Sequence, residues 1–479
     1  MIKGKLIPGC NLPDSRRRRT RILFLAWGFS IHAKRRIEIF IEDPTFAVTV
    51  VSTHDYEFDR ARNVLLKGAQ SNGRTVMDLP VKGECRGEER IDGFHRNSFA
   101  GILGKLRRGI DAAKLLALSV ALLRKQLFSS LNPKWENIRK LKGFISSSEI
   151  RQDVIKASKD LRTIKAVFRV FKPDVVFLQT LLYPCFLAYH LPRSTPIIIT
   201  FWNGDVTWWA QWSGIERRLK KEIVLYGVDR AQAITVNSAS AFKACLQYGA
   251  REGKIRLIRY PGVDLGRFKP SAKSEARTRL KIASEKVVLL PRGLGDYLNS
   301  DIIVEAIPMV IRKRPNTLFL FLAGNGEEQG WEKHLQRAKQ FGVEKNVRWD
   351  GKVPWEIMGQ YYNASDLMVS ISSNDSLPNC MLEAMACGTP IVMGDIPGLR
   401  EWVTDGVNGF LVPLRDPVSL SEKIIGVLDG PEDMMASIVE KNLELARRFF
   451  DSQQNSQEIK KLVLEIAGYH GEKRSATHS

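Results

Sequence analysis

The most informative stretch of this chain is Asp375-Ser-Leu-Pro-Asn-Cys-Met-Leu-Glu-Ala-Met-Ala-Cys-Gly-Thr-Pro390. It follows the apolar run Leu367–Ile371, whose composition is typical of a strand buried in a parallel sheet. Pro378 and Asn379 suit the start of a short helix, and Gly388 with the following proline suits its end. The pattern therefore predicts a strand, a polar loop and a helix N-terminus in direct succession.

That arrangement suits an anion, because the unpaired N–H groups and the dipole of a helix N-terminus point at the loop. Asp375 and Glu383 add two carboxylates eight positions apart, one before the helix and one inside it. A diphosphate at the helix N-terminus would leave Glu383, about one turn into the helix, within reach of neighbouring hydroxyl groups. The spacing predicts a nucleotide-sugar pocket.

Outward from this stretch, strands and helices alternate, which predicts an α/β fold with two doubly wound parallel sheets. In the first half, the runs with strand character are 22–26, 48–51, 175–178, 197–200 and 233–236. In the second half, they are 287–290, 318–321, 346–349, 367–371 and 391–393. Two such sheets that face each other form a cleft at the carboxyl ends of their strands, where ligands of α/β sheets bind.

Composition excludes several classes of protein. The six cysteines of the 479 residues show no C-x-x-C spacing, which argues against structural zinc or a disulfide scaffold and favours a reducing compartment. We expect no membrane-spanning helix, because no run reaches about 18 apolar residues. We also expect no signal peptide, because the first twenty residues lack an apolar core.

The charge is concentrated in the N-terminal half. Residues 1–270 contain 48 Lys and Arg against 24 Asp and Glu, whereas residues 271–479 contain 25 against 28. Such an excess is compatible with nucleic-acid binding, with an anionic membrane surface, or with a solvated basic face. Of these, we expect no nucleic-acid partner.

The local sequence favours the membrane surface. Gly101–Leu131 mixes apolar residues at helical spacing with basic ones, as in a helix that lies on an interface. A surface helix packed on its own domain explains the pattern nearly as well. The basic run Arg16–Arg19 would add electrostatic attraction. The tryptophans at 202, 208, 209 and 212 suit an interfacial anchor, an acceptor platform or simply the core.

The segment Ser376–Val412, with Glu401-Trp-Val and Asp405–Pro413 around its end, resembles the donor-binding region of the retaining glycosyltransferase family 4, the group 1 glycosyl transferases. Further matches follow the order of that family: Ser30–Arg35, Tyr260–Asp264 through Phe268, Ala323–Gly326 and Tyr361–Asp366. The resemblance extends from about 20 to about 430. It implies the GT-B architecture, in which two Rossmann-like domains face a central cleft and the second holds the donor.

With this resemblance, the chain divides into five predicted parts. They are a basic disordered arm at 1–20, an acceptor-side Rossmann-like domain at 21–270 with an insertion at about 80–160, a donor-binding Rossmann-like domain at 271–430, C-terminal helices at 431–468 and a disordered tail at 469–479. The helices of the fourth part are expected at 434–450 and 457–467.

The resemblance also assigns roles to the opening stretch. Glu383 matches the acid that accepts hydrogen bonds from the donor ribose, although a Glu on a helix surface would fit the local pattern too. Asp375 stands where the family usually has a Glu that contacts the transferred sugar, and is otherwise a helix cap. The backbone of Ser376, Leu377 and Asn379 is expected to donate to the β-phosphate or the sugar.

Arg292 matches the arginine that clamps the diphosphate; the alternative is an ion pair with Asp296. The family's clamping Lys is absent, and Tyr297 and Asn299 occupy that stretch. In its absence, stabilisation of the phosphate would depend on Arg292 and the helix N-terminus. Val353 is expected to line the base pocket through its backbone, and Gly324 to border the donor.

Three further candidates lie in the N-terminal half. The run Thr200–Asp205 replaces the family's His by Trp202, which leaves Asp205 as the nearest polar candidate for the acceptor or the sugar. His32 opens the first helix on the cleft side and would orient an acceptor or a phosphate, unless its role is structural. Gly28 gives the preceding turn its flexibility and is placed at the donor.

These features predict a metal-independent glycosyltransferase of the hexosyltransferase type that moves a sugar from a nucleoside diphosphate to an acceptor hydroxyl with retention. No metal site and no cofactor beyond the nucleotide-sugar co-substrate are expected. The acceptor would be a glycan or a lipid-linked molecule in cell-surface polysaccharide or glycolipid synthesis. The location would be the cytoplasm, with peripheral binding at the inner face of the membrane as an extension. A GT-B epimerase and an inactive GT-B binding scaffold stay open as alternatives.

Overall fold

The computed structural model describes residues 18–26, 31–53, 60–66, 148–179, 190–201, 227–322 and 328–475, together with Tyr56, Phe58, Ala188 and Leu225. The basic stretch Gly101–Leu131 and the four tryptophans of 202–212 lie outside the described residues. Among the described residues, no helix combines the length and the apolar character needed to cross a membrane.

The first sheet contains seven of the described strands, in the order β3-β2-β1-β4-β5-β6-β7. They are β1 (Thr20–Ala26), β2 (Phe46–Ser52), β3 (Arg62–Leu65), β4 (Val175–Leu178), β5 (Ile197–Thr200), β6 (Ala233–Val236) and β7 (Ile255–Leu257). Its described helices are α1 (Ile31–Ile41), α4 (Ser148–Phe171) and α7 (Ala239–Gln247). β1 pairs in parallel with both β2 and β4, so the chain order reverses direction at β1.

The second sheet contains six described strands, in the order β10-β9-β8-β11-β12-β13, and all its pairings are parallel. The strands are β8 (Lys286–Leu290), β9 (Thr317–Phe321), β10 (Val347–Trp349), β11 (Leu367–Ser370), β12 (Ile391–Gly394) and β13 (Phe410–Val412). The helices around it are α8 (Lys273–Arg279), α9 (Ser300–Lys313), α10 (Glu328–Gln340), α11 (Met358–Ala364), α12 (Asn379–Cys387) and α13 (Pro417–Leu428).

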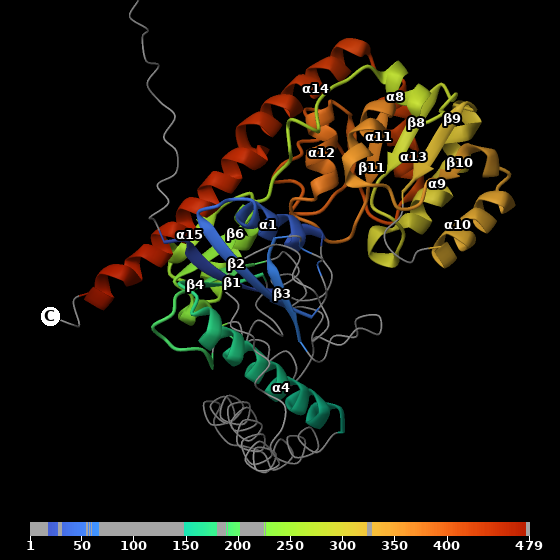
Figure 1. Cartoon of the computed structure of the whole chain (residues 1–479). Helices are drawn as coiled ribbons and strands as arrows, with labels where there is room; N and C mark the ends of the chain where they lie inside the picture. Colours follow the sequence, from blue (N-terminus) through green and yellow to red (C-terminus); the bar gives the residue numbers. More distant parts are fainter. Residues whose placement is uncertain are drawn as a thin grey trace, which may run out of the picture. The chain divides into compact units, whose positions relative to one another are not determined.

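Apolar side chains cover both faces of the second sheet. Val287 and Leu289 of β8 enter a core shared with α8, α11 and α12, whereas Val288 and Leu290 enter a second core shared with α9, α10 and α13. Figure 1 shows these helices around strands β8 to β11. A strand with helices on both faces needs apolar residues at successive positions, which explains why these strands are continuous apolar runs in the sequence.

The strands predicted from the sequence are present, and three more were missed. The missed strands are β3, β7 and β13, and each lies at the edge of its sheet. β3 and β7 are short and each contains an arginine, which weakens the apolar signal, whereas β13 reads Phe410-Leu-Val412 and is apolar throughout. β3 reads Arg62-Asn-Val-Leu65, and its first residue is exposed.

The C-terminal helices extend further than the sequence indicated. α14 (Glu432–Leu445) continues into a π-helical turn to Phe450, and α15 runs from Ser452 to Ser475 rather than ending at Ala467. The segment between β7 and α8 contains the predicted link at Tyr260–Pro270. The domain boundaries themselves stay predictions.

Candidate functional site

The candidate site lies where β8 and β11 end. These strands are neighbours, with Val288 opposite Leu367 and Leu289 opposite Met368. The chain order of the second sheet reverses between them, and ligands of open α/β sheets bind outside the carboxyl ends of strands at such a reversal. Arg292 follows β8, and the loop 371–378 follows β11, so the topology places the predicted diphosphate clamp beside the predicted sugar-binding loop.

Arg292 and Asp375 form an ion pair at this point. The Arg292 guanidinium donates to the Asp375 carboxylate through Nη1, and the same nitrogen lies 3.2 Å from the Ser372 hydroxyl. Ser372 in turn donates to the Asp375 carboxylate over 2.6 Å. The sequence alternative, a pairing of Arg292 with Asp296, is wrong for this conformation. The guanidinium of Arg292 faces the loop after β11, next to the expected position of the diphosphate.

Electrostatics keep the guanidinium charged. Burial by itself lowers the pKa of Arg292, but the neighbouring Asp375 carboxylate more than offsets this effect, and the pKa is raised above its ordinary value. The two side chains are 23% and 16% exposed, so both can be reached by a ligand. Arg292 therefore offers a permanent positive charge at the end of β8.

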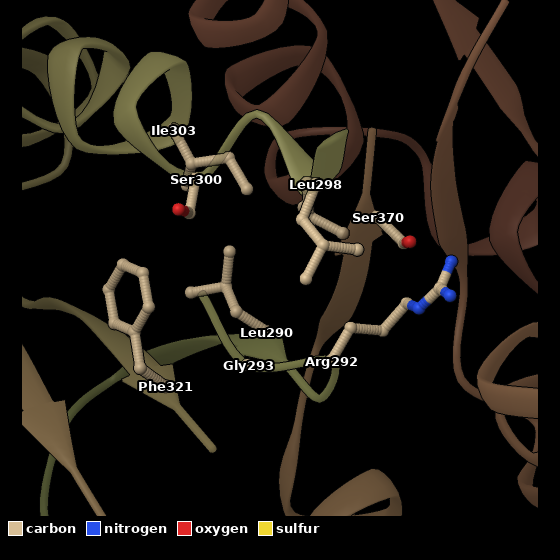
Figure 2. Close-up of a pocket in the computed structure, with 9 residues that line it drawn as sticks. Leu290, Arg292, Gly293, Leu298, Ser300, Ile303, Phe321 and Ser370 are labelled. Atoms are coloured by element: carbon tan, nitrogen blue, oxygen red, sulfur yellow. The ribbon is translucent and has the colours of Figure 1, made fainter. Parts of the chain in front are cut away.

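A small pocket adjoins Arg292. Its lining is largely apolar and comes from β8, β9, β11 and α9: Leu290, Arg292, Gly293, Leu298, Ser300, Ile303, Phe321, Val369 and Ser370. Figure 2 shows the Arg292 guanidinium pointing away from the apolar side chains and lying on the same side as Ser370. The guanidinium of Arg292 therefore points out of the apolar pocket and towards the loop after β11, where Asp375 accepts its hydrogen bond.

Helix α12 begins at Asn379 and ends at Cys387, as the sequence predicts. Pro378 occupies the N-cap with an extended backbone, and no side chain caps the first turn. Gly388 ends the helix in the left-handed region, at φ 73°, which glycine adopts without steric cost. Ser376 and Leu377, which precede the helix, are both buried. The backbone that leads into the helix N-terminus is therefore held by packing.

The backbone before α12 is held by a close approach that the sequence did not reveal. Gly398 packs directly on it: a Cβ at this position would overlap the carbonyl oxygen of Asp375 and lie 2.9 Å from Cα of Ser376. The loop after β12 therefore presses on the backbone that carries the candidate sugar contact. In the sequence, Gly398 follows a proline and resembles an ordinary turn.

Glu383 is buried inside the molecule rather than on the helix surface, being only 7% exposed. Its Oε2 accepts a hydrogen bond of 2.9 Å from the Tyr362 hydroxyl, and its Oε1 accepts one of 3.4 Å from the indole N–H of Trp355. Burial of Tyr362, together with the neighbouring Glu383 charge, raises its pKa well above the ordinary value, so the phenol stays protonated as a donor. The alternative of a solvent-facing helix Glu is wrong.

The stretch that lacks the family's Lys has a supporting role. Asn299 is fully buried in the left-handed region, and its amide donates to Ile371 O over 2.7 Å and to the Ser373 hydroxyl over 2.9 Å. The carbonyl of Tyr297 accepts from Ser373 N–H over 2.7 Å. These bonds tie the start of α9 to the loop after β11. The Tyr297 side chain is largely exposed.

The remaining predicted residues divide into two groups. Val353 lies between β10 and α11 and packs against the core that contains α12, which is compatible with its predicted place near the base. Gly28, Asp205 and Gly324 lie outside the described residues, as does the side chain of His32, whose backbone belongs to the first turn of α1. Their roles stay predictions.

Sequence reasoning missed Tyr362, Trp355, Ser372 and Gly398. Tyr362 belongs to the family-like run Tyr361–Asp366, so the sequence offered a signal for it. The pattern alone does not tell which of the two adjacent tyrosines contacts Glu383. No group of three or more His, Cys, Asp or Glu residues that could hold a metal occurs within the described ranges. Independence from metal ions stays a prediction.

Comparison with known proteins identifies the family to which each half of the chain is similar. A family model described as glycosyltransferase family 4 matches residues 138–267, and one described as glycosyl transferases group 1 matches residues 286–430. A D-inositol 3-phosphate glycosyltransferase of Geodermatophilus obscurus is 34% identical over 216 residues, which are 44% of this chain and 48% of that protein. D-inositol 3-phosphate glycosyltransferase 2 of Catenulispora acidiphila is 32% identical over 240 residues, 49% of this chain and 55% of that one. The chain spans about half the length of these curated relatives.

Solved structures agree on the fold. Anabaena Alr3699/HepE in complex with UDP-glucose superposes with a TM-score of 0.61 at 18% identity, over 93% of this chain and 100% of that one. Sucrose-phosphate synthase from Thermosynechococcus elongatus gives 0.61 at 15% identity, over 94% and 100%. With two doubly wound sheets and a family match in each half, the chain belongs to glycosyltransferase family 4, the group 1 glycosyl transferases, and has the GT-B fold.

Proposed function

We propose that this protein transfers a sugar from a nucleoside diphosphate sugar to an acceptor hydroxyl with retention of the anomeric configuration. One observation carries the proposal: Arg292, the N-terminus of α12 and the buried carboxylate of Glu383 belong to one sheet edge, at the point where the chain order reverses. This arrangement offers a cation, a helix dipole and an acceptor of hydroxyl protons, which are the three partners that a nucleoside diphosphate needs.

Each group then has a part in the reaction. Arg292 and the helix N-terminus stabilise the negative charge that develops on the departing diphosphate, and each such donor is worth roughly 3 kcal/mol in related sites. Glu383 holds the ribose, and Asp375 contacts the transferred sugar. The described residues offer no evident base for the acceptor. A front-face reaction, in which the leaving phosphate takes the acceptor proton, would agree with the family resemblance.

The charge of the chain and the names of the relatives support a proposal for the acceptor. The N-terminal half carries the whole positive excess of the chain, which would attract an anionic acceptor or an anionic membrane surface. The relatives are named for inositol 3-phosphate, an anionic polyol. We therefore propose an acceptor that carries phosphate, with a lipid-linked precursor of a surface glycan as the second choice.

A panel of UDP-, GDP- and ADP-sugars, with inositol 3-phosphate and lipid-phosphate acceptors, tests the proposal. We expect one donor to protect the protein against thermal unfolding and to yield a glycosylated product by mass spectrometry, whose anomeric configuration NMR then assigns. Glu383→Ala should weaken binding of that donor at least tenfold, because a charge-assisted hydrogen-bond acceptor is lost. Binding that is unchanged by this substitution, or no binding of any donor, would contradict the proposal. A parallel assay with EDTA tests metal independence.

An inactive binding scaffold is the second candidate, because the family's Lys is missing and Trp202 replaces the usual His. The same panel separates the two functions. A scaffold would bind the nucleotide sugar and neither hydrolyse nor transfer it with any acceptor. An epimerase would return a changed sugar without an acceptor.

A further inference from the structure

Two side chains, Tyr362 and Trp355, donate hydrogen bonds to the Glu383 carboxylate, and their arrangement suggests a role in orienting it. A buried carboxylate is costly unless it is hydrogen-bonded, and here Tyr362 and Trp355 each donate to a different oxygen. Each oxygen of a carboxylate can accept more than one hydrogen bond. The bonds from Tyr362 and Trp355 restrict the rotation of Glu383, because turning the carboxylate would break both bonds at once.

The two donors are themselves immobilised. Tyr362 is fully buried on α11, with its ring at an edge-on angle of 67° and a centroid distance of 6.1 Å to Phe268. Trp355 lies 5.7 Å from the same Phe268, and the Arg267 guanidinium lies 4.0 Å above its indole ring. A cation over an aromatic face and a packed aromatic edge both favour one orientation of the indole. The Glu383 carboxylate is therefore held from two fixed points.

We propose that Tyr362 and Trp355 are positioning residues that aim the Glu383 carboxylate at the 2′ and 3′ hydroxyls of the donor ribose, and so make the site selective for ribonucleotides over deoxyribonucleotides. The inference rests on the proposed function, because it needs a nucleoside diphosphate in the site. It goes further in assigning discrimination of the sugar of the nucleotide to residues on α11 and on the segment before it.

A purely structural role for the Tyr362 hydroxyl has a different consequence. If the hydroxyl only satisfies a buried carboxylate, its removal lowers the stability of the protein and leaves the preference for ribose unchanged. If it aims the carboxylate, its removal lowers the affinity for the ribonucleotide and not that for the dideoxy analogue. The ratio of the two affinities separates these roles, since a general loss of folded protein cancels in it.

The chain provides a matched control one residue away. The Tyr361 hydroxyl donates to Asp350 over 3.0 Å, whereas the Tyr362 hydroxyl donates to Glu383. Tyr361→Phe and Tyr362→Phe each remove one phenolic hydroxyl from α11, but only the second removes a bond to Glu383. Trp355→Phe removes the other donor and keeps an aromatic ring beneath Arg267.

The experiment measures dissociation constants of wild type and the three variants by calorimetry. The probes are whichever of UDP, GDP and ADP binds wild type most tightly, and the 2′,3′-dideoxy form of that nucleotide. We expect Tyr362→Phe to lower the ribo-to-dideoxy preference about tenfold, Trp355→Phe to lower it less because its bond is longer, and Tyr361→Phe to leave it unchanged.

An unchanged preference in Tyr362→Phe overturns the inference while the proposed function stands. An equal loss in Tyr361→Phe also overturns it, because the effect then belongs to α11 in general. If wild type binds none of the three nucleotides, the proposed function fails and the inference fails with it. Thermal unfolding of each free variant shows that the proteins compared are folded.

Discussion

At the residue scale, the ion pair of Arg292 with Asp375 is the feature that most alters the interpretation of the site. The family resemblance implies that Arg292 binds the diphosphate and Asp375 the sugar, whereas in the structure each is the partner of the other. A diphosphate that binds Arg292 has to compete with a carboxylate held in place by Ser372. Under the proposed function, binding of the donor would therefore require this ion pair to rearrange.

This competition predicts an unusual effect of one substitution. Asp375→Asn should bind the nucleoside diphosphate several-fold more tightly, because it frees Arg292 and removes a negative charge beside the phosphates, yet its kcat should fall because the sugar loses a charged partner. Calorimetry with UDP and a turnover assay measure the two effects separately.

Ser372→Ala is the control for Asp375→Asn, since it loosens the carboxylate and keeps its charge. We expect it to change the affinity for the diphosphate less than Asp375→Asn does. Weaker binding of the diphosphate by Asp375→Asn would mean that Asp375 does not compete for Arg292.

At the element scale, two segments hold the loop between β11 and α12. Asn299, before α9, hydrogen-bonds to the start of the loop, and Gly398 packs against its later part. The close approach of Gly398 requires a missing side chain rather than a special backbone, because its φ lies outside the left-handed region. The site therefore depends on elements that carry none of its chemistry.

Substitution of two glycines by Ala should have opposite effects. Gly398→Ala forces the backbone of Asp375 and Ser376 to move, and should lower the free energy of unfolding by about 1–3 kcal/mol and reduce activity. Gly426→Ala lies in the exposed interior of α13 with no atom within 4 Å of its new methyl group, and should raise stability by up to about 1 kcal/mol. Denaturant unfolding measures both. A stable, fully active Gly398→Ala protein would show that the loop yields easily.

At the scale of the whole molecule, helices α11 and α12 carry ionisable side chains that are buried in the core on one face of the second sheet. Burial raises the pKa of the Cys380 and Cys387 thiols to about 12, with the nearby Glu383 charge adding to the effect, and burial raises that of Tyr361 to about 12 as well. The thiols are neutral in the folded protein at pH values where the unfolded chain has begun to ionise. The contribution of these thiols to the free energy of unfolding is therefore fully present below their ordinary pKa of 9.0 and is lost as the pH rises above it.

This linkage predicts alkaline unfolding. As the pH rises from about 9 towards 12, the unfolded chain loses protons first, so the free energy of unfolding should fall across this range. Thermal unfolding under reducing conditions at pH 8, 9, 10 and 11 follows the change, and Cys387→Ala should show a smaller fall than wild type. A midpoint of thermal unfolding that is constant from pH 8 to pH 11 would contradict the prediction.

A second prediction concerns labelling. At pH 8, iodoacetamide should leave Cys380 and Cys387 of the folded protein unlabelled, because both thiols are buried and protonated.

Much of the fold was accessible from the sequence, because buried parallel strands need continuous apolar runs and helices need starts and stops. The segments 175–178, 197–200 and 233–236 match their strands residue for residue. The short strands β3 and β7 were not accessible, since each contains an arginine and leaves little apolar signal, and the apolar β13 has only three residues. The length of α15 was also missed, because its polar sequence resembles a tail.

The kinds of groups at the site can be read from the sequence alone: two carboxylates about a helix N-terminus, an arginine after a strand, and glycine at the helix end. The partners of these groups depend on the packed fold. Arg292 meets Asp375 across 83 positions because β8 and β11 are parallel neighbours, and Glu383 is buried because α11 packs on α12 and supplies Tyr362. A pattern in the sequence specifies the chemistry and local conformation of a residue, whereas its partners depend on distances that exist only once the sheet and its crossover helices have packed.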